Sequence, residues 1–191
     1  MIYEAISNYA ELTNYIYTID FSKEYNAKRI IISFNKSDFY HLAGFHKLSD
    51  IRHMLRGSKT TVFNKLVNDD RICNMIEYSK YYNSISFRVE LVGHLWYILN
   101  GSYRIFPYTK SANQWSKIKA DYVIRFQYHS KTCYLFLIKK GNVYHVCNSI
   151  FDSMSDYTVH LKPYAIKSKR FISRKNFNLD TEIKEHEKET A

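Results

Sequence analysis

The fold class follows from residues 120–151, which read ADYVIRFQYHSKTCYLFLIKKGNVYHVCNSIF. This stretch is rich in aromatic and β-branched residues, which are enriched in β-strands. It is interrupted by a Ser-Lys pair at 130–131 and a Gly-Asn pair at 141–142, and two-residue breaks of this kind indicate tight hairpins. A fourth strand is predicted over residues 156–162, before Pro163. The second half of the chain is therefore predicted to form an antiparallel four-stranded meander.

The first half of the chain has helical spacing instead. Ala5, Tyr9, Leu12 and Ile16 recur at intervals of three and four residues and predict an amphipathic helix over Tyr3–Thr18. Further helices are predicted over residues 49–57, 60–67, 71–81 and 85–100, and one strand over Arg29–Phe34. The predicted fold class is α+β, with an N-terminal helical half packed on a C-terminal antiparallel four-stranded sheet.

We expect one domain over residues 1–175, with a helical part over about 1–119 and a β-meander over about 120–170. The full length of 191 residues is sufficient for one well-buried core. The remaining residues, 176–191, are acidic and polar and are predicted to form a flexible tail. An alternative is that this tail folds back on a basic surface and restrains activity.

The positive charge is concentrated in one part of the chain. The formal net charge is +10, and residues 101–175 contain 14 lysines and arginines against three acidic residues. This distribution indicates an anionic partner, either nucleic acid or an acidic protein. The N-terminus carries Glu4 and Glu11 where a secretory signal has lysines and an unbroken apolar run, and no apolar run reaches 18 residues. We therefore expect a cytoplasmic protein with no membrane partner.

The predicted hairpins sort the side chains of the sheet by face. If His129 pairs with Thr132 and Lys140 with Val143, one face faces the helices and the other is open to solvent. The open face is predicted to carry Arg125, Gln127, His129, Tyr134, Phe136, His145, Cys147, Ser149, Thr158, His160 and Lys162. Aromatic rings among cations suit single-stranded RNA, because rings stack on bases and cations neutralise phosphates. A slip of one residue in a hairpin would exchange the faces beyond it.

Several segments together resemble a known nuclease superfamily. FYHLAGFHKL follows the first predicted strand, and ADYVIRF, CYLFLIKKG and NSIF follow in the meander. This order resembles the fourth type of the phage-associated branch of the Barnase, EndoU, colicin and RelE-like (BECR) superfamily. The resemblance implies a small metal-independent endoribonuclease, often a toxin acting on tRNA or other cellular RNA, with its active site on the open sheet face. It places His41 and Gly44 in a His-Leu-x-Gly element and Ser149 after the third strand of the meander.

Metal-independent cleavage of RNA needs a base, an acid and a cation near one phosphate. Histidine can take either proton role near neutral pH. We therefore assign the proton transfers to His41 and His145, stabilisation of the phosphate to Lys162 and Arg125, and its positioning to Ser149. The other predicted RNA contacts are Lys47, Arg52, Gln127, Tyr134 and His160. The simpler alternatives are that His41 caps a strand, that Ser149 belongs to a turn, and that Lys47 and Arg52 only solvate a helix.

Two other functions fit the same surface. A non-catalytic RNA-binding or adaptor protein needs only the basic aromatic face, and an acidic protein inhibitor could be its partner instead of RNA. The sequence contains no glycine-rich phosphate loop, no HExxH and no GxSxG, so protease, kinase and dinucleotide-enzyme functions find little support. The three cysteines lack metal-ligand spacing and are predicted to be buried free thiols. We expect no metal and no cofactor.

Overall fold

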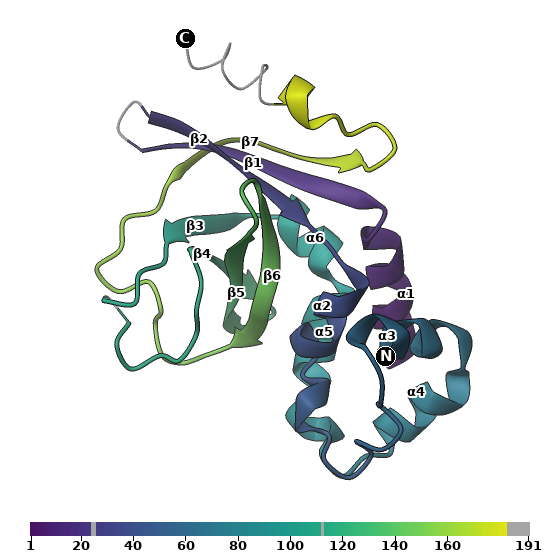
Figure 1. Cartoon of the computed structure of the whole chain (residues 1–191). Helices are drawn as coiled ribbons and strands as arrows, with labels where there is room; N and C mark the ends of the chain where they lie inside the picture. The colour runs from purple at the N-terminus through teal and green to yellow at the C-terminus, as the bar shows by residue number, and fades with distance from the viewer. Residues whose placement is uncertain (24–25, 112, 183–191) are drawn as a thin grey trace.

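A curved seven-stranded sheet runs through the protein in the order β3-β4-β5-β6-β2-β1-β7 (Figure 1). The computed structural model describes residues 1–23, 26–111 and 113–182. The strands are β1 Tyr15–Lys23, β2 Asn26–Ser33, β3 Tyr103–Pro107, β4 Tyr122–Tyr128, β5 Lys131–Lys140, β6 Tyr144–Asp152 and β7 Ala165–Ser173. All neighbouring strands are antiparallel except β2 and β6, which run parallel and pair Ile31 with Tyr144.

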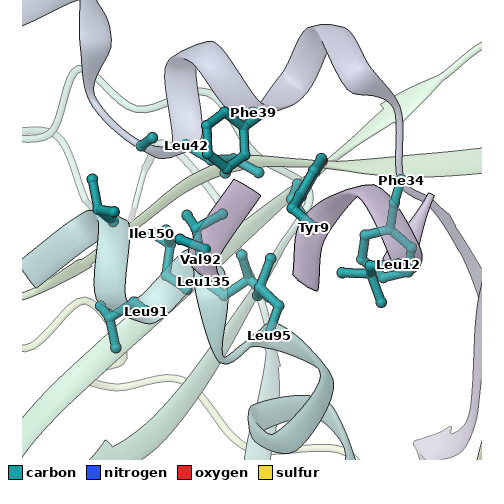
Figure 2. Packing of buried hydrophobic residues seen from close by; sticks show 14 of the residues in the cluster. Tyr9, Leu12, Phe34, Phe39, Leu42, Leu91, Val92, Leu95, Leu135 and Ile150 are labelled. Carbon is teal, nitrogen blue, oxygen red and sulfur yellow. The ribbon is translucent and has the colours of Figure 1, made fainter. Parts of the chain in front are cut away.

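The helices gather on one side of the curved sheet (Figure 1). They are α1 Ile2–Leu12, α2 Lys36–Leu42, α3 Lys59–Asn68, α4 Asp70–Glu77, α5 Ser86–Gly93 and α6 Leu95–Asn100, with short 3-10 turns η1 Phe45–Lys47 and η2 Tyr82–Ser84. Apolar residues of α1, α2 and α5 pack against β5 and β6, as Tyr9, Phe39, Val92, Leu135 and Ile150 do in Figure 2. This main core fixes α2 and α5 beside the end of β6.

The sheet curls until its two outer strands come close. The backbone amide of Tyr164, just before β7, donates a hydrogen bond of 2.8 Å to the carbonyl oxygen of Ile105 in β3. Tyr17, Phe21 and Ile124 are fully buried on the concave side that results. The strands therefore enclose part of the core themselves.

The predicted α+β class is confirmed, but the predicted four-stranded sheet is wrong. Strands β1 and β3 had been predicted as helix or left unassigned, and β2 joins the same sheet, so the N-terminal half supplies strands as well as helices. The strand predicted over 156–162 is also wrong. That segment forms turns, and the last strand, β7, begins after Pro163 and pairs with β1.

In the first hairpin every side chain lies on the sheet face predicted for it. In the second hairpin the side chains in the first part of β6 lie on the opposite face from the predicted one. Tyr128 pairs with Lys131, a shift of two residues that leaves every side chain on its predicted face. In the second hairpin Lys140 pairs with Tyr144, a shift of one, so Cys147 turns into the main core opposite Leu137. A β-bulge at Asn148 then restores the prediction, because Phe136 pairs with Ser149.

The prediction of an open sheet face is wrong for its central part. A second hydrophobic cluster covers that face, formed by Phe106, Tyr108, Val123, Tyr134, Phe136 and Tyr157. Tyr134 and Phe136 are at most 1% exposed, because side chains from residues 108–111, 113–120 and 153–162 pack over them. Aromatic side chains of this face therefore build a core, and only its margins are accessible.

Two local predictions differ in instructive ways. The helix predicted over 49–57 is a series of turns, and Asp50 accepts hydrogen bonds from Ser79 Oγ and the Lys80 amide instead of capping a helix. In the predicted tail, residues 176–182 lie within the described structure and Glu182 is buried against Arg29 of β2, whereas residues 183–191 lie outside it. No helix among the described residues is long and apolar enough to cross a membrane.

Candidate active site

The chain leaves β2 through a turn that sets the position of the candidate site. The backbone amide of Asn35 donates to Asp38 Oδ2 at 3.3 Å, a reciprocal cap that fixes the start of α2. After α2 ends at Leu42, Gly44 adopts a φ of +83°, in the left-handed region that glycine tolerates best. The chain therefore turns back on itself and enters η1 directly.

This turn brings two histidines together. The imidazole rings of His41, at the end of α2, and His46, in η1, have centroids 5.4 Å apart. Both side chains are exposed, as is that of Lys47 next to them. Two imidazoles at this separation can handle two protons at neighbouring positions of one substrate.

Arg88 of α5 lies against the same turn. Its Nε donates to the Leu42 carbonyl at 3.1 Å and its Nη2 to the His41 carbonyl at 3.0 Å, so the guanidinium lies at the negative end of α2. Nη2 also donates to Ser149 Oγ at 3.4 Å. Among the described residues, no carboxylate forms an ion pair with Arg88 and its Nη1 has no hydrogen-bond partner. This half-buried cation is held by neutral groups alone.

Arg88 opens onto a groove of about 390 Å³, which we call the Arg88 groove. Its lining residues are Lys47, Ser84, Phe87, Arg88, Ile118, Ser149, Phe151 and Asp152. The one acidic member, Asp152, is paired with Lys131 at 3.0 Å. The groove therefore presents two cations, Lys47 and Arg88, and two hydroxyl groups, which is a set of donors suited to a phosphate.

Partial burial and nearby cations lower the pKa of both histidines. The pKa of His41 is lowered by burial and by the positive charges of Lys59 and Arg88, while Asp38 acts in the opposite direction. The pKa of His46 is lowered by burial, then by Arg88, and also by a protonated His41. Because each histidine disfavours protonation of the other, a bound anion would favour one protonated and one neutral ring.

The bulge in β6 explains why Ser149 faces the groove. Asn148 is the extra residue, and its Nδ2 donates to the Lys119 carbonyl at 2.8 Å. Ser149 then turns to the side of Phe136, as the sequence predicts, with its hydroxyl toward Arg88. The structure thus brings three predicted residues, His41, Lys47 and Ser149, around one guanidinium.

The structure does not bring His145 to this groove. His145 lies four residues before Ser149 on β6, is 7% exposed, and packs against Tyr122 with ring centroids 5.4 Å apart. Its Nδ1 has no hydrogen-bond partner among the described residues. The one-residue shift in the second hairpin turned it to the helix-facing side. The predicted open surface is therefore wrong for this histidine.

The remaining predicted residues lie elsewhere on the surface or are covered. Arg125 and Gln127 line a separate hollow of about 460 Å³ beside Arg104, and Arg125 is paired with Asp156 at 3.1 Å. Tyr134 is buried and donates to Asp156. Four other predicted residues are exposed but do not line the Arg88 groove: Arg52, His129, His160 and Lys162.

The three cysteines are buried free thiols, as predicted. Burial raises the pKa of Cys73 to about 11 and that of Cys133 to about 12.

Sequence reasoning missed His46 and Arg88. His46 lies within the FYHLAGFHKL segment, and the Gly44 turn between the two histidines is the signal that could have paired them. Arg88 lies in the segment predicted to be helical over residues 85–100, which forms α5 and α6, but no sequence spacing relates it to residue 41. Only the packing of α5 on the end of α2 places it in the site.

An α+β sheet protein with a cationic groove beside paired histidines fits the class of small nucleases. The model of one protein family, described as phage-Barnase-EndoU-ColicinE5/D-RelE like nuclease4, matches residues 1–189. The chain therefore belongs to this nuclease family, and the resemblance in the sequence is confirmed. No match was found among curated proteins or among solved structures.

Proposed function

We propose that the chain is a metal-independent endoribonuclease that cuts cellular RNA, such as tRNA, in a toxin-like or phage-defence role. The observation that carries this proposal is Arg88, a half-buried cation held by carbonyl oxygens and paired with no described carboxylate. Burying an uncompensated charge is costly unless a partner of opposite charge binds. A phosphodiester in the Arg88 groove supplies that partner, and the nuclease family is consistent with it.

The two histidines supply the proton transfers in this mechanism. His46 is surrounded by Arg88, Lys47 and Lys59, which favour its neutral form, so it accepts the proton from the 2′-hydroxyl. The 2′-oxygen attacks the adjacent phosphorus and the bond from phosphorus to the 5′-oxygen breaks. His41 gives its proton to the leaving 5′-oxygen, and the nearby carboxylate of Asp38 offsets part of the lowering of its pKa by burial, Lys59 and Arg88. The products are a 2′,3′-cyclic phosphate and a 5′-hydroxyl. In this mechanism His46 takes the role that the sequence analysis assigned to His145.

The cations of the groove stabilise the negative charge of the phosphorane. Arg88 offers the hydrogens of Nη1, and Lys47 adds a second cation on the same wall. Groups that are already oriented toward the developing charge lower the barrier, because they need no reorganisation. Ser149 positions the phosphate through its hydroxyl, which is already aligned on Arg88.

Cleavage of total tRNA and rRNA in EDTA, followed by mapping of the cut ends, tests the proposal. We expect the unmodified protein to cut and to leave cyclic phosphate ends. His41→Ala and His46→Ala should each lower the rate about 100- to 10,000-fold, the usual contribution of general acid–base catalysis. His53→Ala, which removes an exposed histidine in a nearby turn, and His145→Ala are the matched controls and should retain activity.

The alternative is an RNA-binding or adaptor protein that uses the same groove without chemistry. Production in cells without a cognate inhibitor separates the two, because an active ribonuclease arrests growth and a simple binder does not. An unmodified protein that binds RNA but leaves it uncut would support the binder. An acidic protein as the only ligand would instead give negligible RNA binding even at low salt.

A further inference from the structure

Trp115 is an exposed tryptophan that the proposed mechanism does not use. It is 57% exposed and lies in residues 113–120, which form no helix or strand. Its ring contacts that of Tyr157, with centroids 4.6 Å apart and an angle of 45° between the ring planes. Tyr157 is itself buried in the second hydrophobic cluster. The indole therefore contacts a buried ring and is also accessible to solvent.

Ring contacts and the backbone connect Trp115 to the Arg88 groove. Tyr157 contacts Phe151 at a centroid distance of 5.7 Å, and Phe151 lines the groove. Ile118, three residues after Trp115, lines the groove as well. The hydrogen bond from Asn148 to the Lys119 carbonyl ties the same segment to the bulge beside Ser149. Trp115 thus lies outside the lining of the groove, on a segment that is anchored to it through Ile118, Lys119 and Tyr157.

The charge around Trp115 favours an anionic ligand. Residues 108–120 contain Lys110, Lys117 and Lys119 and no acidic residue, and all three lysines are exposed. An exposed aromatic ring among lysines combines base stacking with attraction for a backbone of phosphates. An acidic peptide would use the lysines but would leave the indole without a partner.

We propose that Trp115 is the stacking platform for an unpaired RNA base next to the phosphate held by Arg88. This inference rests on the proposed function and adds the class of substrate to it: single-stranded or looped RNA. The bases of a duplex are already paired and stacked, so their faces are not available to the indole. Cleavage is therefore directed to loops, bulges and unpaired ends.

Tryptophan fluorescence tests the platform independently of catalysis. The chain has two tryptophans, and Trp96 is stacked on Phe171 with centroids 4.0 Å apart. In a Trp96→Phe, His41→Ala protein, Trp115 is the single reporter and the RNA stays uncut. We expect a single-stranded oligoribonucleotide to quench its emission, and the same oligonucleotide annealed to its complement to quench it far less.

Affinity measurements on variants complete the test. Trp115→Ala should weaken binding of the single strand about 5- to 150-fold, the range for loss of one stacked base, and Trp115→Phe should retain most of the affinity. Tyr97→Ala, which removes another exposed ring from α6, is the matched control and should bind normally. Circular dichroism of each variant verifies its fold.

The outcomes separate this inference from the proposed function. Unchanged emission at saturating RNA, or full affinity in Trp115→Ala, would overturn the platform even if the unmodified protein cuts RNA. Quenching with loss of affinity in Trp115→Ala supports the platform, and it does so even if no RNA is ever cut, in which case only the proposed catalysis is wrong.

Discussion

Gly44 is the residue on which the geometry of the Arg88 groove depends most directly. A Cβ atom on Gly44 would lie 3.0 Å from Ile85 Cγ2 and 3.4 Å from Arg88 Cδ. The residue also has a φ of +83°, which side chains rarely adopt. One position thus satisfies two requirements, the reversal of the chain and the close approach of α5 to it.

We predict that Gly44→Ala destabilises the protein and impairs the groove together. The left-handed backbone should cost about 1–3 kcal/mol, to be measured by urea unfolding. Cleavage should fall as well, because the new methyl group displaces Ile85 and the stem of Arg88. Gly141→Ala is the control: its φ is +68° but no atom lies within 4 Å of the added Cβ, so it should lose stability without losing cleavage.

The ionisation of the two histidines gives a prediction for a residue outside the groove. Lys59 lowers the pKa of both His41 and His46, so Lys59→Gln should raise both pKa values toward that of a free histidine. The acidic limb of the profile of kcat/KM against pH should then move to higher pH, since the base becomes protonated sooner as pH falls. NMR titration of the imidazole protons checks the shift directly. Lys65→Gln on the same helix should leave both histidines unchanged.

At the scale of elements, the C-terminal segment is held by charges on β1, β2 and β7. Arg29 of β2 donates to Asp20 of β1 at 2.5 Å and to Glu182 at 2.9 Å, and Arg170 of β7 donates to Glu182 at 3.0 Å. Asp20, Arg29 and Glu182 have nearly buried side chains. Glu182, in the predicted tail, therefore links the C-terminal segment to these strands through ion pairs. This segment does not line the Arg88 groove.

Glu182→Ala should accordingly affect stability and spare RNA cleavage. Loss of hydrogen bonds to buried charged groups should lower the free energy of unfolding by about 1.5–3 kcal/mol. Asp180→Ala, in the same segment but exposed, is the control and should change it little. A Glu182→Ala protein that is more active than the unmodified one would instead support restraint of activity by the tail.

Elements with strong local signals could be predicted from the sequence, and those decided by distant packing could not. β4 and β5 and most helices follow from aromatic, β-branched and periodic residues. The start of β1 was predicted as helix because Ile16 continues the helical spacing of Leu12. In the structure Ile16 pairs with Ser33 of β2, so this segment is a strand. The one-residue shift of the second hairpin turns His145 away from the groove, and the bulge at Asn148 then turns Ser149 toward it; neither has a sequence signal. The place of Ser149 in the candidate site depends on this bulge.

At the scale of the whole molecule, the net charge of +10 predicts binding to RNA that weakens with salt. If Lys47 contacts a phosphate in the groove, Lys47→Gln should reduce the slope of log affinity against log salt by about 0.7, the value for one contact with a single strand. Lys140→Gln removes an equal charge at the end of β5, beside the start of β6 and away from Ser149, and should leave the slope nearly unchanged. If Lys47→Gln and Lys140→Gln reduced the slope equally, RNA would bind across the whole basic surface and not at the Arg88 groove.

The parallel pairing of β2 with β6 has a consequence for synthesis of the protein. His41 and His46 lie in α2 and η1, the two elements after β2, while Ser149 lies near the end of β6. The histidines and the groove beside them therefore come together only when residues more than 100 positions apart in the chain have met. Contacts of such long range form late, after the intervening loop has been closed. A nascent chain on the ribosome therefore has no assembled groove until translation has passed residue 149. The cell that makes this nuclease is exposed to its chemistry only after β6 has been added to the sheet.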